Sequence, residues 1–423
     1  MKKSSLWKFK KIILAFLFAS TLSAFADRPI YSASFADFDR RARSSEKTVS
    51  VVFFGGSLTW GDGASDPERT SFRGLMQSYL RAKYPNARFA FTDAAIGGTG
   101  SKLGMFRVAP DVLSHNPDLV FLDFTTEDGL AKTDRQSLAS YERILRDLIG
   151  QGVPVLEVLF GAKNYFAEDW SHLGPPRYRD HLEMGNLYHT GIGNSFPILQ
   201  NFFRTNSLSR EEIWPEEDWK ASDVGHQIYF ETARAGLEQA IREKRLCNFP
   251  LEPVFADEYK KRFQLYPGTS ALPSGWHSGK TLRPNSDTRE NANHWISEIA
   301  IAGAKDVSDA VSLKVQFNGT FVGILGEAKN DGLGFRVFVD EEPVPYQIRP
   351  RKEIWPTSTV PWGGGTRFFW YEISDKLSPG RHILEILPVA ESGETGELRI
   401  ESICVAGPGR EVMRLTGDGA TKF

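Results

Sequence analysis

Apolar runs and amphipathic stretches alternate along residues 48–244. Strands are expected at 51–54, 88–95, 118–124 and 153–159, and the nearly continuous apolar run at 118–124 is typical of a strand covered on both faces of a sheet. Apolar residues recur at helical spacing at 71–84, 137–150 and 223–244, and shorter helices are expected at 111–114 and 181–188. This alternation predicts an α/β domain, three layers built around a parallel sheet. Residues 161–220, rich in Trp, Pro, Tyr and His, are expected to form substrate loops.

The pattern changes near residue 250. Short strand-like stretches recur at 295–302, 312–317, 321–325, 334–339, 367–373, 382–387 and 397–405, separated by turn pairs such as Asn-Gly and Pro-Gly. They predict an all-β sandwich, jelly-roll-like, with 250–290 as a linker and first edge strands. We expect this domain to fold separately and to bind or position a polymer. One or two of its tryptophans should be exposed and able to stack on sugar rings, the candidates being Trp276, Trp295, Trp355, Trp362 and Trp370.

Two glycine turns follow predicted strands. Residues 55–57 read Gly-Gly-Ser and place Ser57 at the carboxyl end of a strand, where α/β folds position their sites. Residues 97–101 contain Gly98 in a second such turn, and a third strand ends just before Glu127. We therefore expect these three residues to converge at one edge of the sheet. Gly-Gly-Ser alone fits a cofactor turn or a helix cap equally well.

The last predicted helix begins with an Asp-x-x-His motif formed by Asp223 and His226, and either Ser222 or Asp223 is expected to cap it. A serine hydroxyl becomes nucleophilic when a neighbouring base takes its proton, and histidine with an orienting carboxylate is the common arrangement. Ser57 is thus a candidate nucleophile, His226 a candidate base and Asp223 its orienting acid.

The order and spacing of these motifs resemble the SGNH/GDSL hydrolase superfamily over about residues 48–243. The resemblance implies that Ser57 supplies the nucleophile and that the backbone N–H of Gly98 donates to the oxyanion. It also implies that an asparagine in the third block donates a side-chain amide and that the late Asp-x-x-His supplies acid and base. The phrase at 116–121, Asn-Pro-Asp-Leu-Val-Phe, looks most like the secreted, carbohydrate-active members, and the appended β domain looks like their carbohydrate-binding sandwiches.

The chain departs from this family at two positions. Glu127 stands where the family has asparagine, and a carboxylate repels an oxyanion instead of donating to it; loss of one donor costs about 10² to 10³ in rate. Glu127 would help if burial kept it protonated or if it had another role.

The histidine block can be read in two registers. In one, Asp223 and His226 are the acid and base, with a shortened loop. In the other, residues 221–226 match the family's later Gly-His sequence, so Lys220 falls in the slot of the catalytic histidine and His226 lies beside the site. A third source of a base is the stretch 172–189, which contains His172, His181 and His189.

Residues 1–26 have the pattern of a signal peptide. Lysines precede an apolar stretch at 12–22, and Ala-Phe-Ala at 24–26 fits a cleavage site. The apolar stretch is shorter than the roughly 20 residues of a spanning helix, so an uncleaved anchor is the weaker alternative. The expected organisation is a signal peptide at 1–26, a hydrolase-like domain at 27–248 and a β-sandwich at 249–423. The mature protein is expected to be secreted or periplasmic, with no stable membrane association.

Composition excludes several classes. A net charge of −2 without a lysine or arginine cluster in the mature chain gives no electrostatic basis for nucleic-acid binding. No His/Asp/Glu spacing resembles a zinc site such as H-E-x-x-H, and no cofactor or metal is expected. Two cysteines, Cys247 and Cys404, are too few for a disulfide framework, and the sequence does not decide whether they pair.

The sequence thus favours a secreted serine esterase that removes acetyl or similar acyl groups from a polysaccharide or oligosaccharide ester. One alternative is a catalytically weakened glycan-binding protein of the same fold. Another is a carboxylate-dependent, glycan-active enzyme using Glu127, which needs a second carboxylate about 5 to 9.5 Å away. The candidates for that second group are Asp62, Asp128 and Asp223.

Overall fold

The computed structural model describes residues 33–422 apart from 45–47, 130–134, 167–172, 217–218, 256–258, 282–297, 306, 308–309, 330, 349–350, 358–367, 391–394, 408–411 and 417–418. The predicted signal peptide, His172, Trp295 and Trp362 lie outside the described residues. Within the described part, no helix combines the length and the apolar character that crossing a membrane requires.

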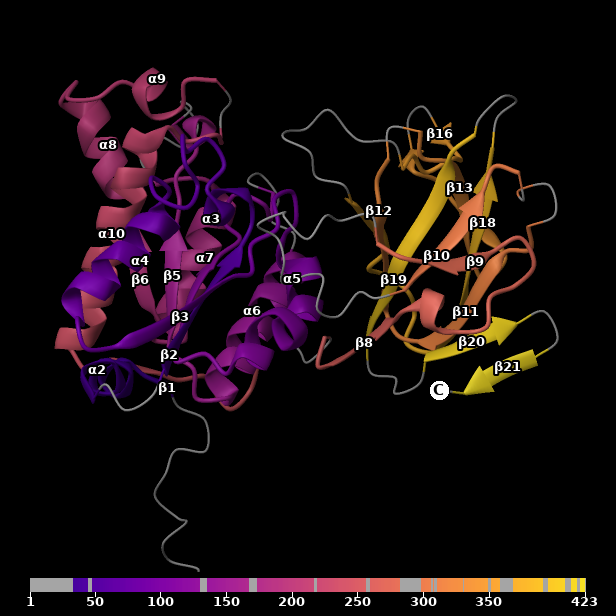
Figure 1. The fold of residues 1–423 in the computed structure, drawn as a ribbon, viewed down its shortest axis with the longest axis horizontal. Helices are drawn as coiled ribbons and strands as arrows, with labels where there is room; N and C mark the ends of the chain where they lie inside the picture. The colour runs from indigo at the N-terminus through magenta and orange to yellow at the C-terminus, as the bar shows by residue number, and fades with distance from the viewer. Residues whose placement is uncertain are drawn as a thin grey trace, which may run out of the picture.

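The first domain is a parallel sheet between helices (Figure 1). Its five strands lie in the order β3-β2-β4-β5-β6 and all pair in parallel. The strands are β2 (Thr48–Gly55), β3 (Arg88–Asp93), β4 (Leu119–Asp123), β5 (Val155–Leu159) and β6 (Gly191–Asn194). The helices are α2 (Phe35–Ser44), α3 (Ser57–Trp60), α4 (Phe72–Lys83), α5 (Ser101–Arg107), α6 (Arg135–Gly150), α7 (Pro176–Leu187), α8 (Phe196–Arg204), α9 (Arg210–Ile213) and α10 (Asp223–Arg242).

Helices cover both faces of this sheet, which explains why β4 and β5 are buried along their whole length and mostly apolar. Helices α4 and α10 pack together on one face, and α5 packs against α6 on the other. Side-chain caps set the start of two helices: Ser71 accepts a hydrogen bond from Gly74 N before α4, and Ser222 accepts one from Gly225 N before α10. Of the two caps expected for the last helix, Ser222 is the one formed. Strand β1 (Ala33–Ser34) pairs with β7 (Leu246–Cys247) and closes the domain.

The expected short helix at 111–114 is different in the structure. A π-helix at Val108–Val112 and a 3-10 helix at Leu113–His115 continue directly from α5, so the helical segment begins at Ser101. A further 3-10 helix lies at Lys163–Phe166 in the region expected to form loops.

The second domain consists of two antiparallel sheets, as expected. One has the order β17-β12-β19-β10-β9, with β8 also paired to β19, and the other has the order β14-β13-β18-β11-β20-β21. The strands are β8 (Lys261–Leu265), β9 (His277–Gly279), β10 (Ile299–Gly303), β11 (Leu313–Asn318), β12 (Phe321–Glu327), β13 (Gly334–Val339), β14 (Glu342–Val344), β17 (Phe368–Ser374), β18 (Arg381–Val389), β19 (Glu397–Gly407), β20 (Val412–Thr416) and β21 (Gly419–Lys422), with a separate pair β15 (Gln347–Ile348) and β16 (Arg351–Lys352) and a 3-10 helix at Pro267–Thr269.

Apolar side chains from both sheets form the sandwich core, for example Val315 and Leu384 from one sheet with Ile324 and Ile400 from the other. Among the described tryptophans of this domain, Trp276 and Trp355 are buried in that core, and Trp370 is half-buried against the first domain.

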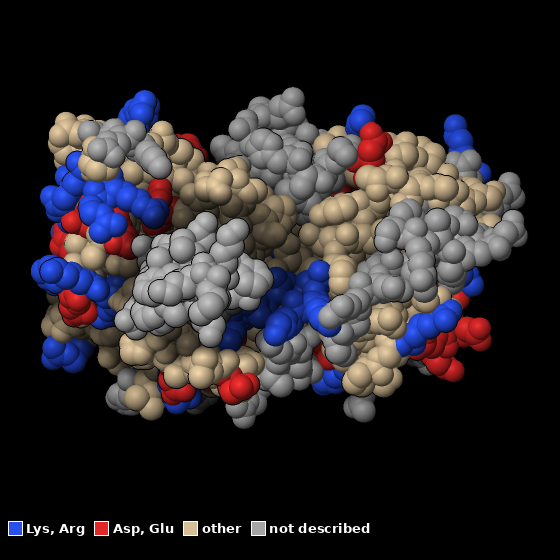
Figure 2. Space-filling model, turned by 90° about the horizontal axis from the view of Figure 1, so that it is seen from below, with Lys and Arg blue, Asp and Glu red and all other residues tan. Residues whose placement is uncertain are grey.

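The two domains share apolar packing. Four residues of the β domain, Phe321, Leu325, Cys404 and Ala406, belong to the same core as the α/β domain. The ring of Phe321 lies 5.9 Å from that of Phe106, which is on α5. Cys247 and Cys404 are both free and buried. On the face shown in Figure 2, acidic and basic side chains are mixed, and a group of basic ones lies in the hollow where the domains meet.

Candidate active site

Ser57 is the first residue of α3, at the point where β2 ends. The chain passes very close to its neighbours here: a Cβ on Gly55 would lie 2.3 Å from the carbonyl oxygen of Asp123, and one on Gly56 would lie 2.2 Å from Cγ of Glu127. Both positions therefore require glycine. The turn leaves Ser57 half-buried at the carboxyl edge of the sheet.

Two backbone donors meet at a single oxygen beside this serine. The N–H groups of Ser57 and Gly98 both donate to Oε1 of Glu127, over 2.8 Å and 3.4 Å. Gly98 has φ of +74°, in the left-handed region that favours glycine, and this conformation turns its N–H toward the serine. The structure thus brings Ser57, Gly98 and Glu127 together at one edge, as expected from the strand ends. Their chemical roles stay predictions.

The carboxylate of Glu127 occupies the point at which the N–H groups of Ser57 and Gly98 meet. Burial raises the pKa of Glu127, while hydrogen bonds from the Ser57 backbone, the Ser57 hydroxyl and the Gly98 backbone act in the opposite direction. Neighbouring Asp128 also raises this pKa by charge repulsion. Glu127 is therefore held by the backbone of both glycine turns and by the Ser57 hydroxyl.

His226 is fully buried in the first turn of α10, and both of its ring nitrogens contact backbone. Nδ1 accepts the N–H of Phe72 over 3.3 Å, so Nε2 carries the proton and donates to the carbonyl of Asp62 over 3.1 Å. Burial lowers the pKa of His226 to about 4. In this arrangement the neutral imidazole fastens the chain after α3 to α10.

Asp223 fastens the same segment. Oδ1 accepts from Ser65 N over 2.8 Å and from the Thr70 hydroxyl over 2.7 Å, and Oδ2 accepts from the Ser65 hydroxyl over 2.6 Å. The hydrogen bond from the Ser65 side chain is the main cause that lowers the pKa of Asp223. Its carboxylate bonds are thus directed at this segment, whereas His226 Nδ1 bonds to Phe72. The expected acid–base pairing of Asp223 with His226 is not the arrangement found, because each group is already engaged elsewhere.

Lys220, which the other register places in the slot of the catalytic histidine, lies near the same segment. The backbone of Lys220 lies against the segment after α3, since a Cβ on Gly63 would come within 2.9 Å of the Lys220 carbonyl carbon. Lys220 is half-buried. Which of Lys220 and His226 acts as base stays a prediction.

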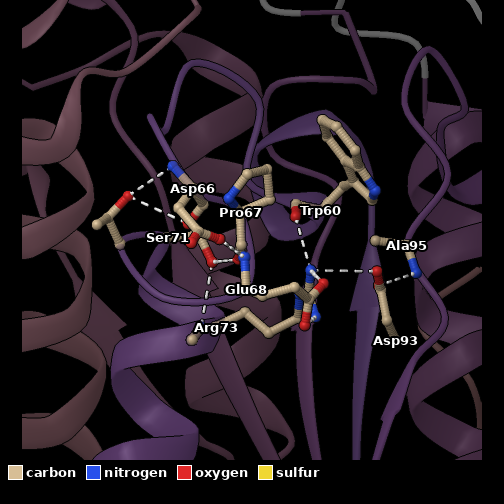
Figure 3. A network of polar contacts seen from close by, with 10 residues as sticks. Trp60, Asp66, Pro67, Glu68, Ser71, Arg73, Asp93 and Ala95 are labelled. Carbon is tan, nitrogen blue, oxygen red and sulfur yellow. Dashed lines mark hydrogen bonds and ion pairs between the residues drawn. The ribbon is translucent and has the colours of Figure 1, made fainter. Parts of the chain in front are cut away.

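The buried residue Arg73, which the sequence patterns did not indicate, binds the last residue of α3 (Figure 3). Arg73 Nη2 donates to the carbonyl of Trp60 over 3.1 Å and to Glu68 over 2.8 Å, and it lies 3.4 Å from Oδ2 of Asp93. Burial raises the pKa of Asp93 to about 6, although the charge of Arg73 opposes that shift. Arg73 lies on the apolar stretch 71–84, so only its position inside that stretch could have drawn attention to it.

More buried polar groups lie behind the site. Thr125 donates through its N–H and its hydroxyl to Asp123, and burial raises the pKa of Asp123 to about 8. Asp128 accepts from Ser101 N over 2.7 Å at the start of α5. His181 is buried with Nε2 3.3 Å from Asp128 Oδ2, while His189 is exposed. Within the described ranges, no group of His, Cys, Asp and Glu is arranged to hold a metal ion.

Residues 53–188 match the profile of the GDSL-like Lipase/Acylhydrolase family. Residues 53–188, which lie within the α/β domain, therefore resemble this family. The match spans the strand before Ser57, the Gly98 turn and the Glu127 block, and it ends before Lys220, Asp223 and His226. The resemblance therefore rests on the front part of the α/β domain, and the histidine block lies outside the matched residues.

Solved structures resemble the chain across both domains. A two-domain esterase (CEX) active on acetylated mannans, co-crystallised with mannopentaose, matches 88% of this chain and 93% of its own with a TM-score of 0.66 at 16% identity. A second structure of a two-domain esterase (CEX) active on acetylated mannans matches 88% and 94% with a TM-score of 0.64 at 15% identity. At this identity the likeness shows the fold of the GDSL-like domain together with its β domain. No curated protein sequence matches the chain.

Proposed function

We propose that this protein is a serine hydrolase that removes acetyl or similar acyl groups from a carbohydrate ester. The observation that carries the proposal is that the N–H groups of Ser57 and Gly98 point at one oxygen next to the serine. Two preorganised donors at such a point stabilise the negative charge that develops on an acyl carbonyl during attack. The two-domain fold supports a carbohydrate substrate, because the similar solved esterase acts on acetylated mannans.

The chemistry would run in two steps. Ser57 Oγ attacks the acyl carbon and loses its proton to a base, either Lys220 or His226, and the carbonyl electron pair moves to the oxygen bound by the two N–H groups. The tetrahedral intermediate collapses to an acyl-serine, and the protonated base donates its proton to the departing sugar oxygen. Water then attacks the acyl-serine by the same route and releases the acid. Glu127 must leave the oxyanion position before the first step.

The proposal includes the protein's location and its substrate. The pattern of residues 1–26 supports export, so the mature chain would be secreted or periplasmic and would meet a polysaccharide or oligosaccharide ester there. The β domain would contribute to binding or positioning that polymer.

A second candidate is a glycan-binding protein that no longer hydrolyses esters. It is favoured by the two nitrogens of His226, both bound to backbone, and by the carboxylate of Glu127 in the oxyanion position. A protein of this kind would keep a carbohydrate site while its serine stayed unreactive.

The test compares the chain from residue 27 onward with its Ser57→Ala variant. Acetate release is measured on acetylated mannan and on p-nitrophenyl acetate, and reducing ends are measured on the same mannan. We expect acetate release that disappears in Ser57→Ala, with no new reducing ends. Binding of acetylated mannan without acetate release would favour the binding protein, and new reducing ends that depend on Glu127 would favour a glycosidic reaction instead.

A further inference from the structure

We propose that Glu127 is a built-in inhibitor of the GDSL-like domain: its carboxylate fills the oxyanion position in the resting protein, and hydrolysis needs that carboxylate to be displaced or neutralised. This inference rests on the proposed esterase function. It goes beyond that function because it predicts a protein that is slow as folded and becomes fast when one side chain is changed.

Substrate and Glu127 compete for the same two N–H donors. Oε1 of Glu127 already accepts the N–H of Ser57 over 2.8 Å and the N–H of Gly98 over 3.4 Å. An acyl carbonyl oxygen attacked by Ser57 would need these two N–H groups at the same point. The two oxygens cannot be there together, so substrate engagement and the resting contact exclude each other.

The Glu127 carboxylate fits closely beside the turn formed by Gly56 and Ser57. Gly56 leaves room for it, because a Cβ there would lie 2.2 Å from Glu127 Cγ and 2.5 Å from Oε1. An ionised acceptor makes stronger hydrogen bonds with N–H donors than a neutral one, so the resting contact is strongest while Glu127 is ionised. The Ser57 hydroxyl bonds to the same side chain. The serine and both oxyanion donors are thus engaged at once.

The N–H groups of Ser57 and Gly98 can be freed by a movement of the Glu127 side chain alone. The backbone at Glu127 is tied down: Glu127 N and Asp128 N both donate to the carbonyl of Phe124, and the Asp128 carboxylate holds Ser101 N. These hydrogen bonds hold the backbone of the turn in place. Rotation of the Glu127 side chain is therefore the smallest movement that frees the N–H groups of Ser57 and Gly98. Shortening that side chain should free them, and neutralising it at constant size should weaken its hydrogen bonds to them.

The experiment measures the reactivity of the serine directly. A fluorophosphonate probe, which phosphonylates an active serine and places its own oxygen in the oxyanion position, is reacted with the parent protein and with Glu127→Asn and Glu127→Gln. Glu127→Asn removes the charge and adds the amide donor found in the family, and Glu127→Gln removes the charge at nearly constant size. Glu183→Gln is the matched control, because it removes a carboxylate from an exposed position on α7.

We expect Glu127→Asn to be labelled about 10- to 100-fold faster than the parent, in line with the 10² to 10³ that one oxyanion donor contributes. Glu127→Gln should also be faster, Glu183→Gln should equal the parent, and a Ser57→Ala/Glu127→Asn double variant should not react. Thermal unfolding of each variant verifies that it is folded.

Three results would overturn the inference. Equal labelling of the parent and both Glu127 variants would mean that the carboxylate does not obstruct the site, while the serine hydrolase proposal would stand. Slower labelling of the variants would mean that Glu127 assists Ser57 as a base. Absence of labelling in folded parent and folded variants alike would reject the serine hydrolase proposal, and the inhibitor with it.

Discussion

Replacing Lys102 by methionine should weaken both the domain interface and catalysis. Lys102 directly follows Ser101, the first residue of α5, and its side chain is 8% exposed. Nζ donates to Glu372 over 2.7 Å and to Asp375 over 3.1 Å, both in the β domain. These charges raise the pKa of Lys102, although burial opposes that shift. The ammonium therefore ties the helix that follows the Gly98 turn to the second domain.

The magnitude follows from the exposure of the partners. Removing one partner of a fully buried ion pair costs about 3 to 5 kcal/mol, because the other charge stays buried and unpaired. Here the Glu372 side chain is 39% exposed and that of Asp375 is 22% exposed, so water screens the two remaining carboxylates. We therefore expect a loss of about 1 to 3 kcal/mol in the free energy of unfolding.

The assay is hydrolysis of p-nitrophenyl acetate together with thermal and urea unfolding. A looser α5 displaces Gly98 N–H, a donor used mainly in the transition state, so kcat should fall while KM changes little. Lys314→Met is the control, because it removes a lysine paired with Glu385 over 2.9 Å inside the β domain. A Lys102→Met/Glu372→Gln/Asp375→Asn variant should recover part of the lost stability, since the two carboxylate charges that faced Lys102 are removed with it.

Unchanged kcat and unchanged unfolding in Lys102→Met would refute this reasoning. The expectation that the β domain folds separately stays a prediction, and the shared core leads to a different expectation for the α/β domain alone. A chain of residues 27–248 lacks Phe321 and Ala406, which complete the core of the α/β domain, and we expect it to lose activity on the small ester as well as on polymer.

The remaining predictions concern the ionisable residues His226, Lys220 and Asp123. His226→Gln should lower the free energy of unfolding by about 1 to 3 kcal/mol, because the hydrogen bonds of the imidazole to the backbone are lost. Lys220→Ala should lower kcat at unchanged stability. A stable but inactive His226→Gln would instead support His226 as the base of a triad. The folded pKa of His226, about 4, lies below its unfolded value, so stability present above about pH 6.5 should be lost as the pH falls toward 4, and less steeply in His226→Gln. The folded pKa of Asp123, about 8, lies above its unfolded value, so ionisation weakens the protein as pH rises, and Asp123→Asn should gain stability over the parent at pH 9 compared with pH 5; an equal difference at both pH values would contradict this.

Hydrophobic periodicity predicted most of the fold. Helix α4 was expected at 71–84 and lies at Phe72–Lys83, and the long apolar runs became the buried strands β2, β4 and β5. Strand β6 was missed because its sequence is rich in glycine, which weakens the strand pattern. The structure supplies the reason: a Cβ on Gly193 would lie 2.7 Å from the Cα of Ala233 on α10, so close helix packing selects glycine there.

The site could be predicted only in part. Chain order located Ser57, Gly98 and Glu127 at one sheet edge, because strand ends meet there. The motif at Asp223 and His226 suggested a proton relay, but the partners of these groups, Asp62 and Ser65, come from a loop without periodicity. Sequence spacing carries no information on which way such side chains turn. The carboxylate in the oxyanion position was visible as a substitution, yet its contact with both N–H groups required the structure.

The core shared between the domains also bears on how the chain reaches its final state during synthesis. An N-terminal domain often folds while later residues are still being made. Here the apolar patch around Phe106 receives Phe321 and Cys404 only when the second domain has been synthesised. Until then that patch remains open to water, to chaperones and to other nascent chains. The α/β core is therefore completed by strands β12 and β19, which are synthesised after all the helices and strands of the α/β domain.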